Sequence, residues 1–548
     1  MWPPPRATTP CRGLLRAGKL GGMVDTGRGA GSTEVANDGA ATTRAAAAAE
    51  DAPPAPSALT ARQRAGLVLA PLAFAWFMLG WAPEGTSLPM RWAMALTAAM
   101  AALWICETIP LAVTALLPLV VLPLAGVGTF AEAAAPYAGD LVFIFIGGFV
   151  LANGVQRAGL HYRVALRIVR LTGTRRAAVV AALISLTAFI SLWISNTAAA
   201  VLMLPVGLAV YEALVPRGDE PDFAGALVLG IATGATIGGM GTPVGSTPNL
   251  IFAAVARELY GVRVSFAGWA AVGVPIVVAF GAIAWCVLTR LVYPLHRAPR
   301  VDAHAERHAV LAAHRALGPV RLVEVLAGAV FCATALGWVM RGPWHVGDRR
   351  FGLIVAFPQI TDGVIAVAGA VAMFLIPISL KPWRFALDWK SGGRIPWEVI
   401  LLIGGGLSLA EGIQRSGMDG VLVNATRQLG AVAPWVALVA LCALTVAMSE
   451  VASNTATAAL LLPIAGAMAA GMGLNPLYLM LPIAFSASLG LMMPAATPPN
   501  ALALGSGHVS VAKMALAGAL LNLIGLALII ASCYLIGFRA FGVTGGSR

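Results

Sequence analysis

Long apolar stretches recur along the chain after residue 60 and limit what it can fold into. At roughly 17 to 25 residues each, such stretches are long enough to cross a bilayer as helices. They lie at 64–81, 90–106, 109–128, 140–156, 265–289, 323–340, 363–379, 397–413 and 512–537. Apolar and polar residues do not alternate within them, which argues against a transmembrane β-barrel. Only 11% of the residues are charged, against about 25% in soluble chains, so the sequence predicts an all-α polytopic membrane protein.

Much of the positive charge lies in three connections between these stretches. The formal net charge is +12, and arginines and lysines gather at 157–176, 290–315 and 381–394. Basic connections of this kind stay on the cytoplasmic side of a membrane, so they predict orientation and a cytoplasmic N-terminus, with no nucleic-acid partner. Residues 1–60 are rich in Pro, Gly, Ala, Thr and Arg and lack an apolar stretch, which predicts a disordered tail.

No motif of a common enzyme class occurs in the chain. A Walker A sequence, an HExxH motif and a serine nucleophile elbow are all missing from it. The six cysteines are scattered and form no CxxC pair, which argues against a cysteine metal site and a disulfide framework. We therefore expect neither an enzyme nor an organic cofactor.

An internal repeat divides the apolar part of the chain into two related halves. IGGFVLANGVQRAGL (146–160) and GGGLSLAEGIQRSGM (404–418) lie 258 positions apart and share 8 of 15 residues. At the same offset, SNTAAAVLMLP (195–205) and SNTATAALLLP (453–463) share 8 of 11 residues. A third related pair, described below, follows in the same order, and together the pairs indicate a duplication.

The second half is predicted to cross the membrane upside down relative to the first. Between the start of the stretch at 140–156 and the start of its copy at 397–413, the chain is predicted to cross the membrane five times. The crossings are 140–156, 224–258, 265–289, 323–340 and 363–379. An odd number inverts the copy. Inverted repeats with interrupted helices are typical of secondary transporters.

Each half carries the polar triplet Ser-Asn-Thr inside an apolar run, at 195–197 and 453–455. Ser and Asn favour caps and turns over helix interiors, so we expect a break there and a new helix from about Ala198. The free N–H groups and the positive dipole end of such a helix form a ready anion site. Two such helices from opposite leaflets would form one site near the midplane.

Two further serines precede the triplets by one helical turn. Ser191 lies four residues before Ser195, and Ser449 lies four residues before Ser453. On a continuous helix, each pair would share one face. Clustered hydroxyl and carbonyl oxygens are hard ligands that suit Na⁺.

Proline-containing linkers follow the triplets in both halves. GGMGTPVGSTPNLIF (238–252) and LMMPAATPPNALAL (491–504) are apolar runs, and within them TPVGSTPN (242–249) and MPAATPPN (493–500) lie 251 positions apart. Proline removes an N–H group and displaces the carbonyl four residues earlier. We predict an unwound linker in the middle of each helix, whose free carbonyls can coordinate a cation.

Glu450 directly precedes the second triplet region. An acidic residue at this depth is costly without a partner or a function. Structural hydrogen bonding and coupling to ion movement both remain open for it.

These motifs, together with CETIPLAVTALLPLVVLP (106–123), resemble the divalent anion/sodium symporter family of dicarboxylate, citrate and sulfate transporters. The resemblance extends from about residue 60 to the C-terminus. It implies a homodimer with about eleven transmembrane helices and two re-entrant hairpins per protomer. It also implies a substrate-carrying part that moves like an elevator.

Carried onto this sequence, the family pattern implies two Na⁺ sites and one anion site. One Na⁺ would bind Ser191, Ser195, Asn196 and the Gly245 carbonyl, and the other would bind Ser449, Ser453, Asn454 and the Ala496 carbonyl. The anion would contact Asn196, Thr197, Ser246, Asn454, Thr455, Thr497 and Pro498. Na⁺ is thus expected as a co-transported ion.

The predicted layout has seven parts. They are a cytoplasmic tail (1–60), N-terminal transmembrane helices (61–138), a first repeat core (139–293), a cytoplasmic linker (294–320), connecting transmembrane helices (321–395), a second repeat core (396–538) and a C-terminal tail (539–548). The Ala/Gly/Arg-rich tail favours a bacterial protein of the inner membrane.

The function favoured by the sequence is Na⁺-coupled symport of a C4-dicarboxylate such as succinate, malate or fumarate. A Na⁺-independent dicarboxylate or citrate exchanger and a sulfate symporter of the same fold stay open. From another class, an anion channel or a membrane-embedded binding component is disfavoured, because two mirrored interrupted helices are typical of alternating access.

Overall fold

The computed structural model describes residues 59–80, 86–159, 163, 175–215, 220–295, 318–342, 344–346, 349–380, 383–389, 395–418, 420–421, 433–494 and 496–543. The chain divides into two units, residues 1–59 and 60–548, and every element named below belongs to the second. Nearly all of the tail predicted at 1–60, most of the linker predicted at 294–320 and half of the tail predicted at 539–548 lie outside the described residues.

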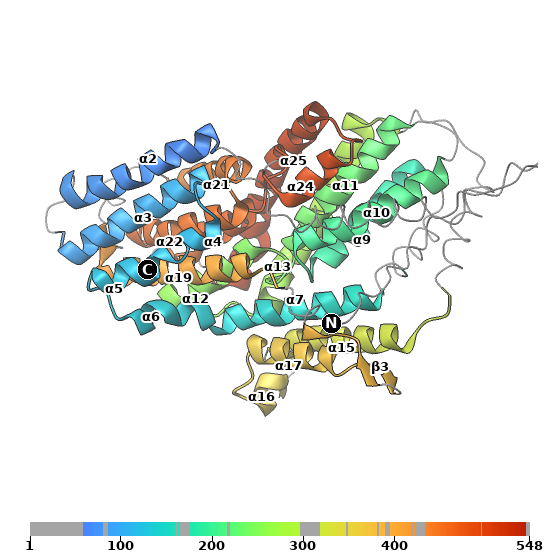
Figure 1. Cartoon of the computed structure of the whole chain (residues 1–548), viewed down its shortest axis with the longest axis horizontal. Helices are drawn as coiled ribbons and strands as arrows, with labels where there is room; N and C mark the ends of the chain where they lie inside the picture. Colours follow the sequence, from blue (N-terminus) through green and yellow to red (C-terminus); the bar gives the residue numbers. More distant parts are fainter. Residues whose placement is uncertain are drawn as a thin grey trace, which may run out of the picture. The chain divides into compact units, whose positions relative to one another are not determined.

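Helices make up almost all of the described secondary structure (Figure 1). The first half contains α2 (Ala61–Ala75), α3 (Leu88–Cys106), α4 (Leu111–Thr114), α5 (Leu117–Leu124), α6 (Phe130–Ala134), α7 (Asp140–Ala158), α9 (Arg176–Ser191), α10 (Asn196–Leu214), α11 (Pro221–Gly239), α12 (Thr247–Tyr260) and α13 (Phe266–Cys286). The second contains α15 (Leu322–Arg341), α16 (Leu353–Ala356), α17 (Asp362–Phe374), α19 (Trp397–Ser416), α21 (Pro434–Val451), α22 (Asn454–Gly471), α23 (Leu477–Ser486), α24 (Pro498–Gly505), α25 (Val511–Ser532) and α26 (Phe538–Ala540). Short 3₁₀ or π turns extend several of them, at Trp76–Gly80, Ala135–Ala138, Val287–Val292 and Cys533–Gly537.

Within the described residues, nine helical segments are long and apolar enough to cross a membrane. Five further apolar helices are shorter, and among them is α9, whose 16 residues give a length of about 24 Å at 1.5 Å per residue. The polytopic helical architecture predicted from the sequence is therefore confirmed. The departures from it are two small antiparallel ribbons, β1 (Trp344–Val346) with β2 (Arg349–Phe351) and β3 (Pro377–Leu380) with β4 (Trp383–Phe385).

Two of the expected apolar stretches are not continuous helices. The stretch at 109–128 is split into α4 and α5, because Pro118 has no N–H to donate to the Thr114 carbonyl, where α4 ends. The stretch at 363–379 is helical only to Phe374, because Pro377 begins strand β3. Proline therefore shortens both stretches.

Helix α11 packs closely against α9 along three glycines spaced four residues apart. A methyl group on Gly230 would lie 3.1 Å from Ile184 Cγ1, and one on Gly234 would lie 2.7 Å from the Ile184 carbonyl oxygen. A methyl group on Gly238 would overlap the carbonyl of Ala188. Small residues at this spacing let two helix backbones approach each other in a membrane protein. Helix α9 is thereby held against the helix that precedes the first linker.

Residues of the first basic connection contact the chain just after the second connection and a residue of the third. Arg163 forms an ion pair with Glu324, Nε to Oε2 at 2.7 Å, and donates to the Gly318 carbonyl at 3.0 Å. Arg157 at the end of α7 lies 3.6 Å from Asp388 in the third connection. These contacts tie the end of α7 to the segment that contains Asp388, and Arg163 to the beginning of α15.

A buried ion pair closes the base of the helical hairpin that α9 and α10 form, called the first hairpin below. Arg176, at the start of α9, pairs its Nε with Glu220 Oε2 at 3.0 Å and donates from Nη2 to the Leu214 carbonyl at 3.1 Å. The guanidinium also lies 4.9 Å from the centre of the Phe223 ring. These contacts join the beginning of α9, the end of α10 and the beginning of α11.

We expect Glu220→Gln to destabilise the protein by about 3 kcal/mol, because it leaves a buried guanidinium without its carboxylate. The loss of stability is measured as a fall in the midpoint of thermal unfolding in detergent. Glu258→Gln is the matched control, since Glu258 forms a more exposed pair with Arg257 at 3.6 Å, and should change stability by less than about 1 kcal/mol. Equal midpoints for the two variants would show that the buried pair contributes nothing.

Candidate functional site

The first triplet forms the tip of a helical hairpin. Helix α9 ends at Ser191, and α10 begins at Asn196 rather than at Ala198 as expected. The helix begins earlier because Ser195 is its N-cap and accepts a hydrogen bond from the Ala198 N–H at 3.3 Å. Ser191 and Ser195 thus end one helix and begin the next, so the expectation that they share one helical face was wrong.

The second triplet repeats this arrangement. Helix α21 ends at Val451, α22 begins at Asn454, and Ser453 takes the N-cap position without a side-chain cap bond. Ser449 is buried in the last turn of α21. In both hairpins, therefore, a helix C-terminus and a helix N-terminus meet at the triplet, with the negative end of one dipole beside the positive end of the other.

Both predicted helix interruptions are present. The first lies between α11 and α12, at 240–246, and the second between α23 and α24, at 487–497. A buried asparagine ties each linker. Asn249 Nδ2 donates to the carbonyls of Gly239 (2.9 Å) and Thr242 (2.7 Å).

Asn500 makes the equivalent bonds in the second half, to Gly490 and Met493, both at 3.1 Å. Each of these three positions lies 251 residues after its counterpart in the first half. The asparagines satisfy carbonyls that the interruptions free from helical bonding. Both asparagines lie within the repeated linkers, and their shared offset was the sequence signal for this role, which was not predicted.

A glycine in each half allows the triplet asparagine to approach the linker. A methyl group on Gly239 would overlap Asn196 Oδ1. One on Gly490 would lie 3.0 Å from Asn454 Oδ1 and 3.1 Å from the Ser449 carbonyl oxygen. Sequence reasoning also missed this pair, which again lies 251 positions apart.

Oxygen atoms converge at the tip of the first hairpin. Ser191 Oγ donates to the Ala235 carbonyl at 2.6 Å. One terminal atom of the Asn196 amide lies 3.1 Å from Ser191 Oγ and 3.1 Å from the Gly245 carbonyl oxygen. If that atom is nitrogen, it donates to both. If it is oxygen, it can accept a hydrogen bond from Ser191 Oγ and faces the Gly245 carbonyl oxygen, and the hydroxyl, amide and carbonyl oxygens together form a donor set that fits Na⁺.

The second hairpin tip has a corresponding cluster. Ser449 Oγ donates to the Ala487 carbonyl at 2.7 Å. Asn454 Oδ1 and Thr497 Oγ1 are buried, and neither has a hydrogen-bond partner among the described residues. A methyl group on Gly490 would come within 3.3 Å of the Ala496 Cβ, so the linker passes close to Asn454. Buried oxygens without a donor are suited to a cation or a polar ligand.

The two halves meet at their linkers. Ser246 Oγ lies 3.2 Å from Ser488 Oγ, and both side chains are buried. Helix α24, which follows the second linker, packs against α10 and α11 of the first half. Ser488 is a site residue that the sequence did not indicate, because its repeat counterpart at position 237 is isoleucine.

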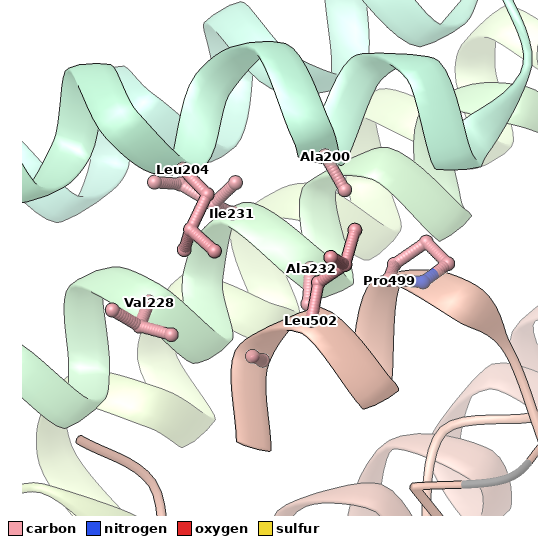
Figure 2. Close-up of a pocket in the computed structure, with 8 residues that line it drawn as sticks. Ala200, Leu204, Val228, Ile231, Ala232, Pro499 and Leu502 are labelled. Carbon is pink, nitrogen blue, oxygen red and sulfur yellow. The ribbon is translucent and has the colours of Figure 1, made fainter. Parts of the chain in front are cut away.

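A small apolar hollow, too tight to admit a water molecule, lies where α10, α11 and α24 pack together (Figure 2). Its lining consists of Ala200, Leu204, Val228, Ile231, Ala232, Pro499, Leu502 and Ala503. Because no polar side chain lines it, the hollow does not suit a charged solute. It reflects packing of the second half against the first hairpin.

The remaining predicted anion contacts differ in exposure. Thr197 and Pro498 are exposed, and Thr455 is half-buried. Ser246 and Thr497 are 6% and 4% exposed, and each immediately precedes the helix that follows its linker. None of the residues at these tips and linkers is a lysine or arginine, so helix N-termini and any bound cations would have to balance an anion.

The chain matches the profile of the citrate transporter family over residues 101–480 and 435–546. It is 34% identical over 480 residues to the sodium-dependent dicarboxylate transporter SdcS of Staphylococcus saprophyticus, covering 86% of this chain and 91% of the relative. It is also 34% identical over 487 residues to SdcS of Staphylococcus aureus strain USA300, covering 87% and 91%.

Two solved transporter structures share the fold. The YdaH transporter of Alcanivorax borkumensis superposes with a TM-score of 0.53 at 16% identity, covering 86% of this chain and 99% of that one. MtrF of Neisseria gonorrhoeae, described as one of a class of antimetabolite efflux pumps, superposes with a TM-score of 0.54 at 14% identity, covering 89% and 98%. At these identities the likeness concerns the fold alone.

The duplicated hairpins and interrupted helices, the family profile and the 34% identical relatives lead to one conclusion. The protein is an integral membrane transporter and not an enzyme, and it belongs to the divalent anion/sodium symporter family.

Proposed function

We propose that the protein couples the movement of Na⁺ to the uptake of a C4-dicarboxylate such as succinate, malate or fumarate. The observation that carries this proposal is the pair of oxygen clusters at the two hairpin tips, built from Ser191 with Asn196 and from Ser449 with Asn454. The names of the relatives, sodium-dependent dicarboxylate transporters, support it.

In this proposal each cluster binds one Na⁺. The first ion contacts Ser191, Ser195, Asn196 and the Gly245 carbonyl; the second contacts Ser449, Ser453, Asn454 and the Ala496 carbonyl. The C-termini of α9 and α21 direct their carbonyls and negative dipole ends towards the ions. Discontinuous helices of this kind coordinate Na⁺ in secondary transporters.

The substrate carboxylates bind beside the ions, at the N-termini of α10 and α22. Asn196, Thr197 and Ser246 contact one end of the anion, and Asn454, Thr455, Thr497 and Pro498 contact the other. Because these residues include no fixed cation, the two Na⁺ ions supply the charge that balances the dianion. Anion affinity is then Na⁺-dependent, and the empty site buries no uncompensated charge.

The hairpins with α11–α13 and α23–α25 form the part that carries the substrate, and it moves like an elevator against the remaining helices. A cavity of about 150 Å³ lies between α12 and the elements around α7 and α19, and Asp140, Arg257, Glu258 and Glu411 contribute to its lining. Arg257 lies 3.6 Å from Asp140, a long ion pair that a sliding motion can break. A homodimer in a bacterial inner membrane, with a cytoplasmic N-terminus, completes the proposal.

The test is uptake of labelled succinate by proteoliposomes that contain the purified protein, with and without an inward Na⁺ gradient. Na⁺-dependent accumulation that unlabelled fumarate or malate reduces is the expected result. Exchange with preloaded succinate in the absence of Na⁺ would instead indicate an antiporter. If succinate is not transported under either condition, sulfate and citrate are the next substrates to measure, and the dicarboxylate assignment is abandoned.

A further inference from the structure

The Glu450 carboxylate holds the second linker. Its Oε1 accepts hydrogen bonds from the N–H groups of Leu491 (2.8 Å) and Met492 (2.9 Å), and its Oε2 accepts one from Met493 (2.9 Å). A fourth bond comes from Asn522 Nδ2 on α25, at 2.6 Å from Oε1. Three of these four bonds end on Oε1 and one on Oε2, so most of the carboxylate's roughly four acceptor positions serve to hold the linker against α25.

A neutral hydroxyl group holds the first linker, where a carboxylate holds the second. Leu192 occupies the position that corresponds to Glu450, at the offset of 258 residues. There the Thr242 hydroxyl donates to the Leu192 carbonyl and accepts a hydrogen bond from the Gly245 N–H at 3.2 Å. The residue that corresponds to Thr242 in the second half is Met493, whose side chain cannot make these bonds.

This difference in how the two linkers are held affects the candidate cation sites. Ser449 precedes Glu450 directly and bonds to the start of the same linker through the Ala487 carbonyl. The linker segment that Glu450 holds lies between Gly490, which approaches Asn454, and Ala496. One carboxylate therefore fixes the linker that carries the proposed second Na⁺ site and places a negative charge beside it. The first site has no such charge in its linker contacts.

We propose that Glu450 is a positioning residue that supports Na⁺ binding at the second cation site, a support that the first site lacks. It fixes the linker through three backbone N–H groups, and its charge favours a cation nearby because Coulomb interactions are strong in a low-dielectric environment. This inference rests on the proposed function. It assigns the open role of Glu450 to hydrogen bonding that supports an ion site.

Two variants separate charge from geometry. Glu450→Gln removes the charge but keeps an oxygen for the linker N–H groups. Asn522→Ala keeps the charge and removes one of the four donors. Glu450→Asp keeps the charge on a shorter side chain, and Glu398→Gln, at an exposed glutamate in the first turn of α19, is the matched control for loss of a carboxylate.

We would measure the Na⁺ concentration for half-maximal succinate uptake and, on purified protein without substrate, the Na⁺ concentration that half-saturates thermal stabilisation. Glu450→Gln should raise both about tenfold, while the maximal uptake rate and the half-saturating succinate concentration at saturating Na⁺ change less than about twofold. Glu450→Asp should restore most of the Na⁺ affinity. Asn522→Ala should raise both concentrations about threefold, and Glu398→Gln should match the wild type.

Two results in Glu450→Gln would overturn the role assigned to Glu450. One is half-saturating Na⁺ concentrations equal to those of the wild type, and the other is a tenfold loss of maximal uptake rate without a change in Na⁺ dependence. If Glu450→Gln does not fold, a wild-type Na⁺ response in Asn522→Ala would do the same. A wild-type protein that responds to Na⁺ in neither measurement would instead refute the proposed function, and the inference with it.

Discussion

Replacing Asn196 or Asn454 by alanine is expected to abolish Na⁺-driven uptake and to leave the protein folded. Each asparagine is the first residue of its helix, α10 or α22, and its amide lies at the proposed contact between a Na⁺ and a substrate carboxylate. Loss of one such contact should lower uptake at a fixed Na⁺ concentration at least about 100-fold, equivalent to ~2.7 kcal/mol. The measurement is initial succinate uptake in proteoliposomes, with the thermal unfolding midpoint as the folding control.

Aspartate at either position distinguishes ion binding from anion binding. Asn196→Asp keeps the oxygen that a cation needs but adds a negative charge beside the substrate. We expect Na⁺-induced thermal stabilisation to persist in this variant while succinate uptake is lost. Wild-type uptake by both alanine variants would remove these asparagines from the transport site.

Replacing Gly239 or Gly490 by alanine is expected to lower uptake almost as much as replacing the triplet asparagines. At Gly239 it would occupy the place of Asn196 Oδ1, and at Gly490 it would lie 3.0 Å from Asn454 Oδ1. The asparagine must then move away from its linker, and the cluster of oxygens opens. Because a shift of about 1 Å in such a site can cost two orders of magnitude, we expect Gly239→Ala to lower uptake about 100-fold and Gly490→Ala somewhat less.

Gly281→Ala is the matched control, since it lies within α13 and a methyl group there would meet nothing within 4 Å. In a helix this substitution should leave uptake unchanged and raise stability slightly. The readouts are initial uptake rate and Na⁺-induced thermal stabilisation. If Gly239→Ala and Gly281→Ala behave alike in both, the close approach of Asn196 to the linker has no role in transport.

The sequence by itself determined the class of the protein and the paired nature of its site. Apolar stretches of membrane length are a local property that can be recognised directly in the sequence. The repeated triplets at 195–197 and 453–455 and the proline-containing linkers are also local patterns. Caps and proline breaks act within one helical turn, so the hairpin tips and the interrupted helices could be placed from the sequence to within a few residues.

The tertiary structure alone decided which distant groups meet at those tips. The contact between Ser246 and Ser488 joins residues 242 positions apart, and the bond between Glu450 and Asn522 joins two helices that no motif relates. The close approach of Asn196 to Gly239 depends on packing of α9 against α11. Linker groups freed by a helix break can bond to any neighbour that folding brings near, and a local pattern does not specify that neighbour. The repeat therefore predicted two similar sites. Long-range contacts decided that the Glu450 carboxylate holds the linker of one site and the Thr242 hydroxyl holds the linker of the other.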